Sequence, residues 1–325
     1  MAAPVVTPSR FATAELPDDW GQRVERWEAH NARSLIALAC RPPHGGTFDA
    51  VEQNLQLPRV HLARVRGTAH QVERSAAVVE SHPAHAITVY ATLRGEALVE
   101  YDGRRRVLRP GQLLVCDADR PFVRGFGHGL DELAVKVPRS AVAELTGRDG
   151  LPTPLVVDAA DAHGRALARL VGRALRREAP VPADEQAVVE LVSVLAGRVP
   201  TAVNHRVAAR AFVEEHLADA DLGAPEVAAA AGVSGRTLSR VFADVGTTVP
   251  RHILGRRLDG AYALLASQPE QRTADVAPRC GFTSLAWFSE TFVRRFGVTA
   301  GQVRLGAGTS CDFRHHPRHP SARRL

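Results

Sequence analysis

The cysteines of this chain form no recognisable motif. Cys40, Cys116, Cys280 and Cys311 are widely separated and lack the CxxC or CxxH spacing of a zinc site. This scatter predicts free thiols in a reducing compartment rather than a disulfide or zinc framework.

Long apolar runs are also lacking. No stretch approaches the roughly 18 consecutive apolar residues that span a membrane. Arg10, Asp18, Asp19 and Arg23 precede any apolar run at the N-terminus, which argues against a secretory signal peptide. We therefore expect a cytoplasmic protein with no membrane partner.

Lysine is nearly absent, since Lys136 is the one lysine among 41 basic residues. Against 35 acidic residues the net charge is +6, an excess too small to identify a nucleic-acid-binding protein by itself. The preference for arginine has two interpretations: a GC-rich genome, or bidentate contacts to phosphate and guanine.

The chain is long enough for two globular domains, because it has 325 residues, of which 45% are hydrophobic. Apolar residues at helical spacing predict a helix near residues 20–35. From about 58 to 138, short alternating runs follow one another, with turn signals at Asp102-Gly103 and Pro110-Gly111. Strands at this density predict a β-barrel or jelly roll within an N-terminal domain of residues 1–157.

Two amphipathic helices are predicted in the segment 158–200. They either form a dimer seam or pack on their own barrel, and we expect a homodimer. A second domain is expected over residues 201–304, after a short linker. The tail, residues 305–325, has few apolar residues and no periodicity, so we expect a disordered basic tail whose histidines are solvated rather than bound to metal.

The C-terminal third contains the same pattern twice, about fifty residues apart. The copies read EVAAAAGVSGRTLSRVF (Glu226–Phe242) and DVAPRCGFTSLAWFSETF (Asp275–Phe292). Each has an acidic residue followed by Val-Ala, a glycine, a short polar turn and a helix that ends on phenylalanine. Two helix-turn-helix patterns in tandem predict a protein that reads DNA with two recognition helices on one chain.

In the first copy, Ser234 is placed to cap the second helix, and the apolar positions recur at i, i+3 and i+4 from Leu238. These apolar residues must face the core, which leaves Arg236, Ser239 and Arg240 directed outward. Arginine on such a face can pair bidentately with guanine in the major groove. The alternative is that two exposed arginines only solvate the helix.

The second copy is less basic. Thr283 or Ser284 is placed to cap its helix, and its phenylalanines form the inward stripe. The outward positions are Leu285, Ala286, Ser289 and Glu290, with Arg294 and Arg295 near the helix end. Small apolar residues can contact a thymine methyl group and glutamate can accept from cytosine, but a carboxylate facing phosphates is repelled. We therefore expect weaker or more backbone-dominated binding from this copy.

Between the copies, residues 250–267 read as one continuous helix with an apolar stripe, and Arg256 and Arg257 are expected to lie off that stripe. Such a helix is about 27 Å long. This length approaches the ~34 Å between successive major-groove faces on one side of a duplex, so the spacer can hold two recognition helices one turn apart.

Residues 205–304 resemble the AraC/XylS family of bacterial transcription regulators. The residues that carry the resemblance are Gly232-Val233-Ser234, Leu238 to Phe242, Arg257-Leu258, Ala261, Leu264-Leu265, Gly281-Phe282, Phe288, Phe292, Phe296-Gly297 and Arg304. The resemblance implies two helix-turn-helix subdomains that bind an asymmetric site on double-stranded DNA, and base-reading roles for the outward residues named above. Three positions depart from the family pattern. They are Ala300, where the family usually has proline, Glu290, where arginine is common, and Pro278.

The β-rich segment resembles the cupin-like sensor domain that such regulators often carry. A metal-dependent cupin needs two closely spaced histidines, a glutamate and a later histidine. Here His82 and His85 precede a strand and no HxH follows Gly95, so we expect no metal, no cofactor and no catalytic site. Arg94 or Arg124 is placed to recognise an acid, but the sequence does not identify the effector.

The leading hypothesis is an α+β protein in which a cupin-like sensor responds to a small molecule and a double helix-turn-helix unit regulates transcription. The family favours activation, with contact to RNA polymerase. Two alternatives stay open: a metal-dependent cupin enzyme with a DNA-binding appendage, and a constitutive DNA-binding protein whose β domain serves only assembly.

Overall fold

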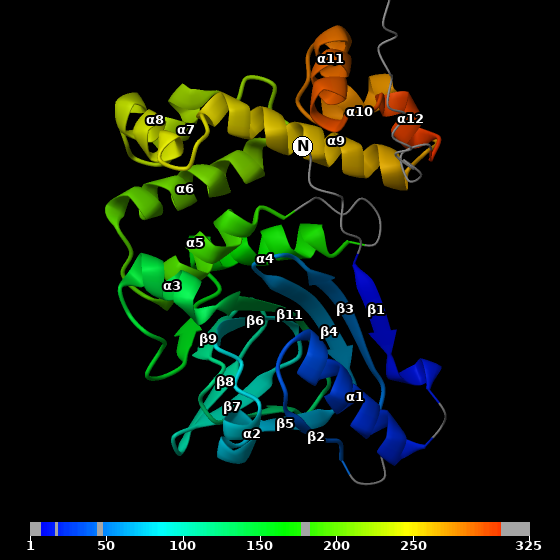
Figure 1. Cartoon of the computed structure of the whole chain (residues 1–325), viewed down its shortest axis with the longest axis vertical. Helices are drawn as coiled ribbons and strands as arrows, with labels where there is room; N and C mark the ends of the chain where they lie inside the picture. Colours follow the sequence, from blue (N-terminus) through cyan, green and yellow to red (C-terminus); the bar gives the residue numbers. More distant parts are fainter. Residues whose placement is uncertain (1–7, 17–18, 44–47, 177–182, 307–325) are drawn as a thin grey trace, which may run out of the picture.

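The elements fall into two stacked units, a β-rich unit formed by the first half of the chain and an all-helical unit formed by the last third (Figure 1). The structure is a computed structural model, and it describes residues 8–16, 19–43, 48–176 and 183–306. The α+β class and the order of a β-rich domain before a helical domain are confirmed.

Twelve strands of the described residues form two antiparallel sheets. The seven-stranded sheet has the order β1-β3-β4-β11-β6-β9-β12 and the five-stranded sheet the order β2-β5-β10-β7-β8. The strands are β1 (Ser9–Ala12), β2 (Ala39–Arg41), β3 (Ala50–Gln56), β4 (His61–Gly67), β5 (His70–Arg74), β6 (Ala86–Arg94), β7 (Ala97–Tyr101), β8 (Arg104–Leu108), β9 (Leu113–Asp117), β10 (Phe122–Phe126), β11 (Leu130–Pro138) and β12 (Leu155–Val157). Since both sheets keep outer strands, the cupin-like domain is a two-sheet sandwich, as in the jelly roll that was the second of our two predicted alternatives, and it is not a closed barrel.

Local turn chemistry explains where the strands reverse. Asp102 and Gly103 both have positive φ, 46° and 70°, as a two-residue type I′ hairpin requires, and they join β7 to β8. Gly111, after Pro110, has φ 89° at the turn between β8 and β9. Both turn predictions are therefore confirmed.

Helices cover the outer face of the seven-stranded sheet. The helices of this part are η1 (Thr13–Glu15), α1 (Trp20–Ser34), α2 (Ala76–Ser81), α3 (Arg139–Thr146), α4 (Ala162–Ala174) and α5 (Glu185–Ala196). A core cluster joins α3, α4 and α5 to that sheet, and a second cluster lies between the two sheets. Every residue from Ala187 to Ser193 of α5 is buried. The helix α5 therefore packs on its own domain, which was the second of the two alternatives for this segment.

The helical unit consists of α6 (Thr201–His216), α7 (Ala224–Ala230), α8 (Gly235–Ala243), α9 (Val249–Ser267), α10 (Thr273–Arg279), α11 (Leu285–Phe296) and α12 (Ala300–Arg304). It has two cores, one formed with α6, α7 and α8 and the other with α10, α11 and α12. Val249 and Ile253 of α9 belong to the first core, whereas Leu258, Ala261 and Leu265 belong to the second. The predicted continuous helix between the copies is confirmed, and it is shared by both subdomains.

One expectation about α9 is wrong. Arg256 and Arg257 were expected outside the packed face, but both are buried. Arg256 pairs with Glu214 of α6, and Arg257 donates to the carbonyl oxygens of Leu217 and Asp219. A guanidinium carries five donors, so it can be buried where several acceptors converge.

Candidate DNA-binding interface

The two helix-turn-helix copies have the same backbone turn. In the first, the Val233 N–H donates to the Ala228 carbonyl, and in the second the Phe282 N–H donates to the Ala277 carbonyl. The turn glycines have φ of +66° and +80°. At Gly281 an added Cβ would also lie 2.5 Å from the Leu217 carbonyl oxygen, so this position excludes any side chain.

The recognition helix of the first copy, α8, is capped and oriented as predicted. The Ser234 hydroxyl accepts from the Thr237 N–H at 3.2 Å. Leu238 and Phe242 are buried in the first core, at 1% and 0% exposure. This inward packing turns the opposite face of α8 to solvent.

The predicted base-reading residues of α8 lie on that exposed face. Arg236, Ser239 and Arg240 are all exposed. Within the described ranges, neither Arg236 nor Arg240 has a hydrogen-bond or ion-pair partner. Two guanidinium groups are therefore available to an external acceptor such as a base edge or a phosphate.

The recognition helix of the second copy, α11, is capped by Ser284, whose hydroxyl accepts from the Trp287 N–H at 3.3 Å. Phe288 and Phe292 are fully buried, as predicted. The five outward residues, Leu285, Ala286, Ser289, Glu290 and Arg294, are all exposed. The structure thus places them on one accessible side of the helix.

This face of α11 differs in chemistry from that of α8. Glu290 occupies the position equivalent to Arg240, and its carboxylate pairs with Arg294 one turn later. The Ser289 hydroxyl donates to the Leu285 carbonyl at 2.9 Å. Because these groups bond one another, α11 offers an external partner fewer unpaired donors than α8 does.

The neighbouring arginine, which the sequence placed only near the helix end, fixes α11 in place. Arg295 pairs with the buried carboxylate of Asp259 on α9 at 2.6 Å. Asp259 in turn accepts from Arg256 on the same helix. The spacing of Asp259 gave no signal for this role, because the pair joins residues 36 positions apart.

A buried charge cluster connects the β-rich unit to α8. Glu190 of α5 has 0% exposure and accepts from Arg206 of α6 at 2.7 Å and from Arg210 at 3.1 Å. Arg206 also donates to the Val241 carbonyl of α8 at 3.0 Å. One carboxylate of the first unit is therefore two hydrogen bonds away from the first recognition helix. We call Glu190, Arg206 and Arg210 the junction cluster.

His252 of α9 lies beside this cluster and packs its ring against Phe242 of α8. Burial, followed by the nearby Arg210 guanidinium, lowers the pKa of His252 to about 4. The imidazole is therefore neutral at physiological pH.

The space between the two sheets contains a second buried ion pair. Arg124, predicted as an acid-recognising residue, pairs with Glu132 at 2.6 Å and lies over the Tyr90 ring. The cavity beside it measures only about 30 Å³, roughly the volume of one water molecule. Arg124 is thus already neutralised by the protein, whereas Arg94, the other candidate, is exposed.

The described residues also bear on the other predictions. They contain no group of three or more histidine, cysteine or acidic side chains that could hold a metal ion. Among the described helices, none is both long and apolar enough to cross a membrane. Cys40, Cys116 and Cys280 are free and buried, and burial raises the pKa of each thiol. Cys311 and the predicted tail after residue 306 lie outside the described residues.

Comparisons with known proteins match both parts of the chain. A family model described as an AraC-binding-like domain matches residues 27–199, and one described as a helix-turn-helix domain matches residues 227–306. The transcriptional activator NphR of Rhodococcus sp is 30% identical over 311 residues, which cover 88% of this chain and 90% of the relative. The transcriptional activator RhrA of Rhizobium meliloti (strain 1021) is 34% identical over 93 residues, which cover 28% of this chain and 30% of RhrA. Among solved structures, the AraC-like transcriptional activator CuxR has a TM-score of 0.48 at 20% identity and covers 78% of this chain and 96% of that one.

Proposed function

This chain belongs to the AraC/XylS family of DNA-binding transcriptional regulators, and on that premise we propose that it activates transcription from an asymmetric operator in response to a small-molecule effector. The observation that carries the proposal is the arrangement of α8 and α11. Each helix buries one face in its own core and exposes the other, and the single helix α9 joins the two cores. Activation is proposed because NphR, which matches over most of the chain, is a transcriptional activator.

The two recognition helices have unequal roles in this proposal. Arg236 and Arg240 of α8 read bases, since their guanidinium groups are exposed and unpaired within the described part of the chain. The outward residues of α11 contribute apolar and backbone contacts, because Glu290 repels phosphate and pairs with Arg294. Most of the sequence discrimination then comes from α8.

The junction cluster supports a response to an effector. It places a carboxylate of the AraC-binding-like domain against α6, and α6 against the last turn of α8. A ligand that shifts α5 would change these contacts, and an effect of ~1–3 kcal/mol on operator affinity is typical of such coupling.

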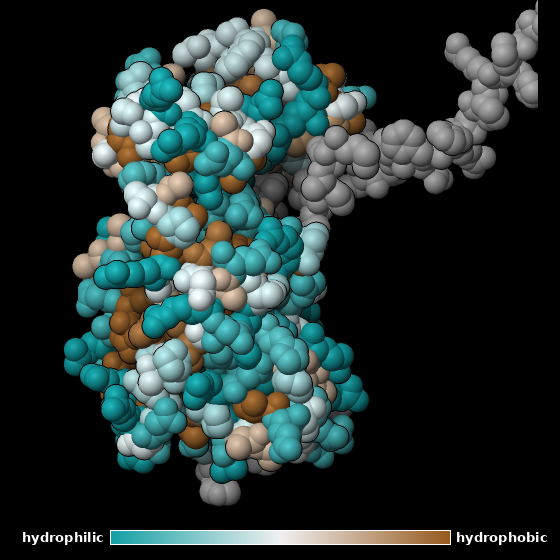
Figure 2. All heavy atoms as spheres, turned by 60° about the vertical axis from the view of Figure 1, so that its left-hand side comes forward, coloured by the Kyte–Doolittle hydropathy of each residue, from teal (hydrophilic) through white to brown (hydrophobic). Residues whose placement is uncertain are grey.

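The regulator is further proposed to act as a homodimer in the cytoplasm, where it has access to DNA and RNA polymerase. Figure 2 shows hydrophobic side chains gathered on the surface directly below the helical unit. Leu155 and Val156 of the outer strand β12 are also partly exposed apolar residues of the β-rich unit. Because α5 is buried in its own domain, exposed surfaces such as β12 are better dimer candidates than α5.

The proposal is tested by selecting an operator from genomic DNA with the purified protein and measuring binding to it and to single-base variants. Arg240→Ala should lose about 1–3 kcal/mol of discrimination at one base pair, because a bidentate base contact is removed. Arg105→Ala, which removes the same charge from the β7–β8 hairpin, serves as the control and should keep full discrimination.

Two results would contradict the proposal. If Arg240→Ala lowers the affinity for all DNA sequences equally, Arg240 contacts phosphate rather than a base. Salt-sensitive binding of the unaltered protein without any preferred sequence would remove the regulator function itself.

A further inference from the structure

A cavity of about 360 Å³ opens at one end of the β-sandwich, at the β3–β4 turn, the start of β6 and the end of β11. Small-molecule pockets typically measure a few hundred Å³ or more. The polar residues that line it are Gln56, Arg59, His61, His85 and Lys136. None of the described residues lining it is an aspartate or glutamate, so its charged groups are all basic.

Lys136, the one lysine of the chain, lines this cavity and lies opposite His61 in the β4–β11 register. Its ammonium group donates to the Leu35 carbonyl at 2.7 Å, which leaves two of its three donors for another acceptor. It forms no ion pair with a carboxylate of the described residues. Burial, together with the charge of Arg74, lowers the pKa of Lys136, as expected for an ammonium group that lacks a close counterion.

His85 at the mouth of the cavity has a left-handed backbone conformation, with φ of +48°. Such a conformation is uncommon for a residue other than glycine and often marks a ligand site. It is held by Asp119, whose carboxylate accepts from the N–H groups of Ala84 and His85 at 2.6 and 2.9 Å.

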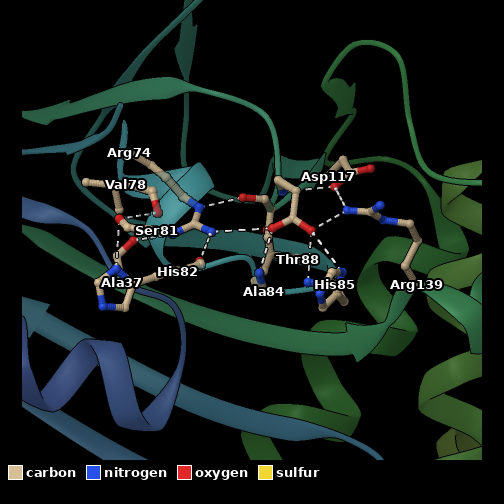
Figure 3. A network of polar contacts seen from close by, with 12 residues as sticks. Ala37, Arg74, Val78, Ser81, His82, Ala84, His85, Thr88, Asp117 and Arg139 are labelled. Carbon is tan, nitrogen blue, oxygen red and sulfur yellow. Dashed lines mark hydrogen bonds and ion pairs between the residues drawn. The ribbon is translucent and has the colours of Figure 1, made fainter. Parts of the chain in front are cut away.

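Asp119 is itself anchored from two sides. It pairs with Arg74 at 3.4 Å and with Arg139 at 2.5 Å. Figure 3 shows Arg74 and Arg139 on opposite sides of this network, with Ala84 and His85 between them. The same carboxylate lies 3.7 Å from His85 Nδ1, so it partly offsets the charge of that ring, but among the described residues it forms no ion pair with Lys136 or Arg59.

We propose that this cavity is the effector site and that the effector is a small organic carboxylate. Its carboxylate lies against Lys136 and the donors around it, and its apolar part lies along Pro58, Val60 and Ala86. This inference rests on the proposed function of an effector-responsive regulator and adds the chemical class of the effector.

The same cavity has a continuous polar connection to the first recognition helix. The Arg59 side chain at its mouth donates to Gln186 of α5 at 3.0 Å, and Gln186 donates to Glu190 at 2.9 Å. Glu190 belongs to the junction cluster, whose Arg206 contacts the Val241 carbonyl of α8. A bound carboxylate that attracts the Arg59 guanidinium therefore competes with the hydrogen bond from Arg59 to Gln186, which is the first contact of this connection.

The test titrates the full-length protein calorimetrically with benzoate, phenylacetate and hexanoate, each beside its neutral primary amide, and with inorganic phosphate. At least one acid should bind at least tenfold more tightly than its amide. Lys136→Met should weaken that binding about tenfold to a hundredfold, because a charge-assisted hydrogen bond is lost. Arg94→Met, which removes an exposed charge outside the cavity, should bind as the unaltered protein does.

Arg59→Met provides a second variant at an exposed position, where folding is not at risk. It should still bind the acid but lose the effect of the acid on operator affinity. Any of three results would overturn the inference: acids that bind no better than their amides, phosphate that binds as tightly as the acids, or acid binding that is unchanged in Lys136→Met. Operator binding is measured in parallel with and without each acid, and its absence under every condition would instead contradict the proposed function.

Discussion

At the scale of single residues, arginines have two separate roles in this protein. Arg236 and Arg240 are exposed and unpaired among the described residues, whereas Arg206 and Arg256 are buried beside carboxylates. The difference depends on which side of a helix each one occupies and on acceptors far away in sequence. The sequence predicted the exposed pair from helical spacing, but it gave no sign of the buried pair, whose partners come from other helices.

His252 gives a prediction for the pH dependence of stability. The pKa of the unfolded imidazole is about 6.5, while burial and Arg210 lower that of the folded one to about 4. Between these values the unfolded chain takes up a proton that the folded chain does not, so the free energy of unfolding should fall as pH decreases from 6.5 to 4. His252→Gln should flatten this slope in urea titrations at several pH values.

His128→Gln, at an exposed turn position, is the control and should keep the slope of the unaltered protein. Part of the slope should survive in His252→Gln, because burial also lowers the pKa of His61 to about 4. An unchanged slope in His252→Gln would show that His252 is not kept neutral by the folded structure.

At the scale of helices and strands, the contact between α5 and α6 depends on Glu190. Glu190→Gln leaves the buried Arg206 guanidinium without a carboxylate partner among the described residues, and it leaves Arg210 with Asp184 at 3.8 Å. We therefore expect the free energy of unfolding to fall by about 3 kcal/mol. Glu215→Gln removes an exposed partner of Arg169 instead and should cost less than about 1 kcal/mol. Equal losses in the two variants, measured by urea unfolding, would contradict a structural role for the junction cluster.

Most helices of the DNA-binding unit were predictable, because their signals are local. Ser234 and Ser284 cap their helices, and the periodic phenylalanines and leucines occupy the two cores. Pro278 departs from the family pattern, yet α10 continues through it to Arg279. A proline removes only its own N–H donor, and this one is the next-to-last residue of the helix.

The arrangement of the strands was less predictable. Turns such as Asp102-Gly103 follow from two residues, but sheet order depends on pairing between distant segments such as β1 with β3. The choice between a barrel and a two-sheet jelly roll therefore did not follow from the sequence. The cavity around Lys136 was missed for the same reason, because its walls come from β4, β6 and β11. The scarcity of lysine was the one available signal.

At the scale of the whole molecule, the protein combines a sensor sandwich, a buried junction and two recognition helices on one shared helix (Figure 1). The 19 residues of α9 extend about 28 Å, close to the rise of one turn of B-DNA. This length is compatible with the proposal that one copy of the chain contacts two successive major-groove segments and that its unequal helices bind an asymmetric site.

The most direct test of this account is a hydroxyl-radical footprint of the full-length protein on its selected operator. We predict two protected segments on one face of the duplex for each bound copy, ~10 base pairs apart and of different sequence. Arg240→Ala should lose protection at one segment only. A single protected segment, or a palindromic pair in which each bound copy covers one identical half, would contradict the account of two recognition helices on one chain.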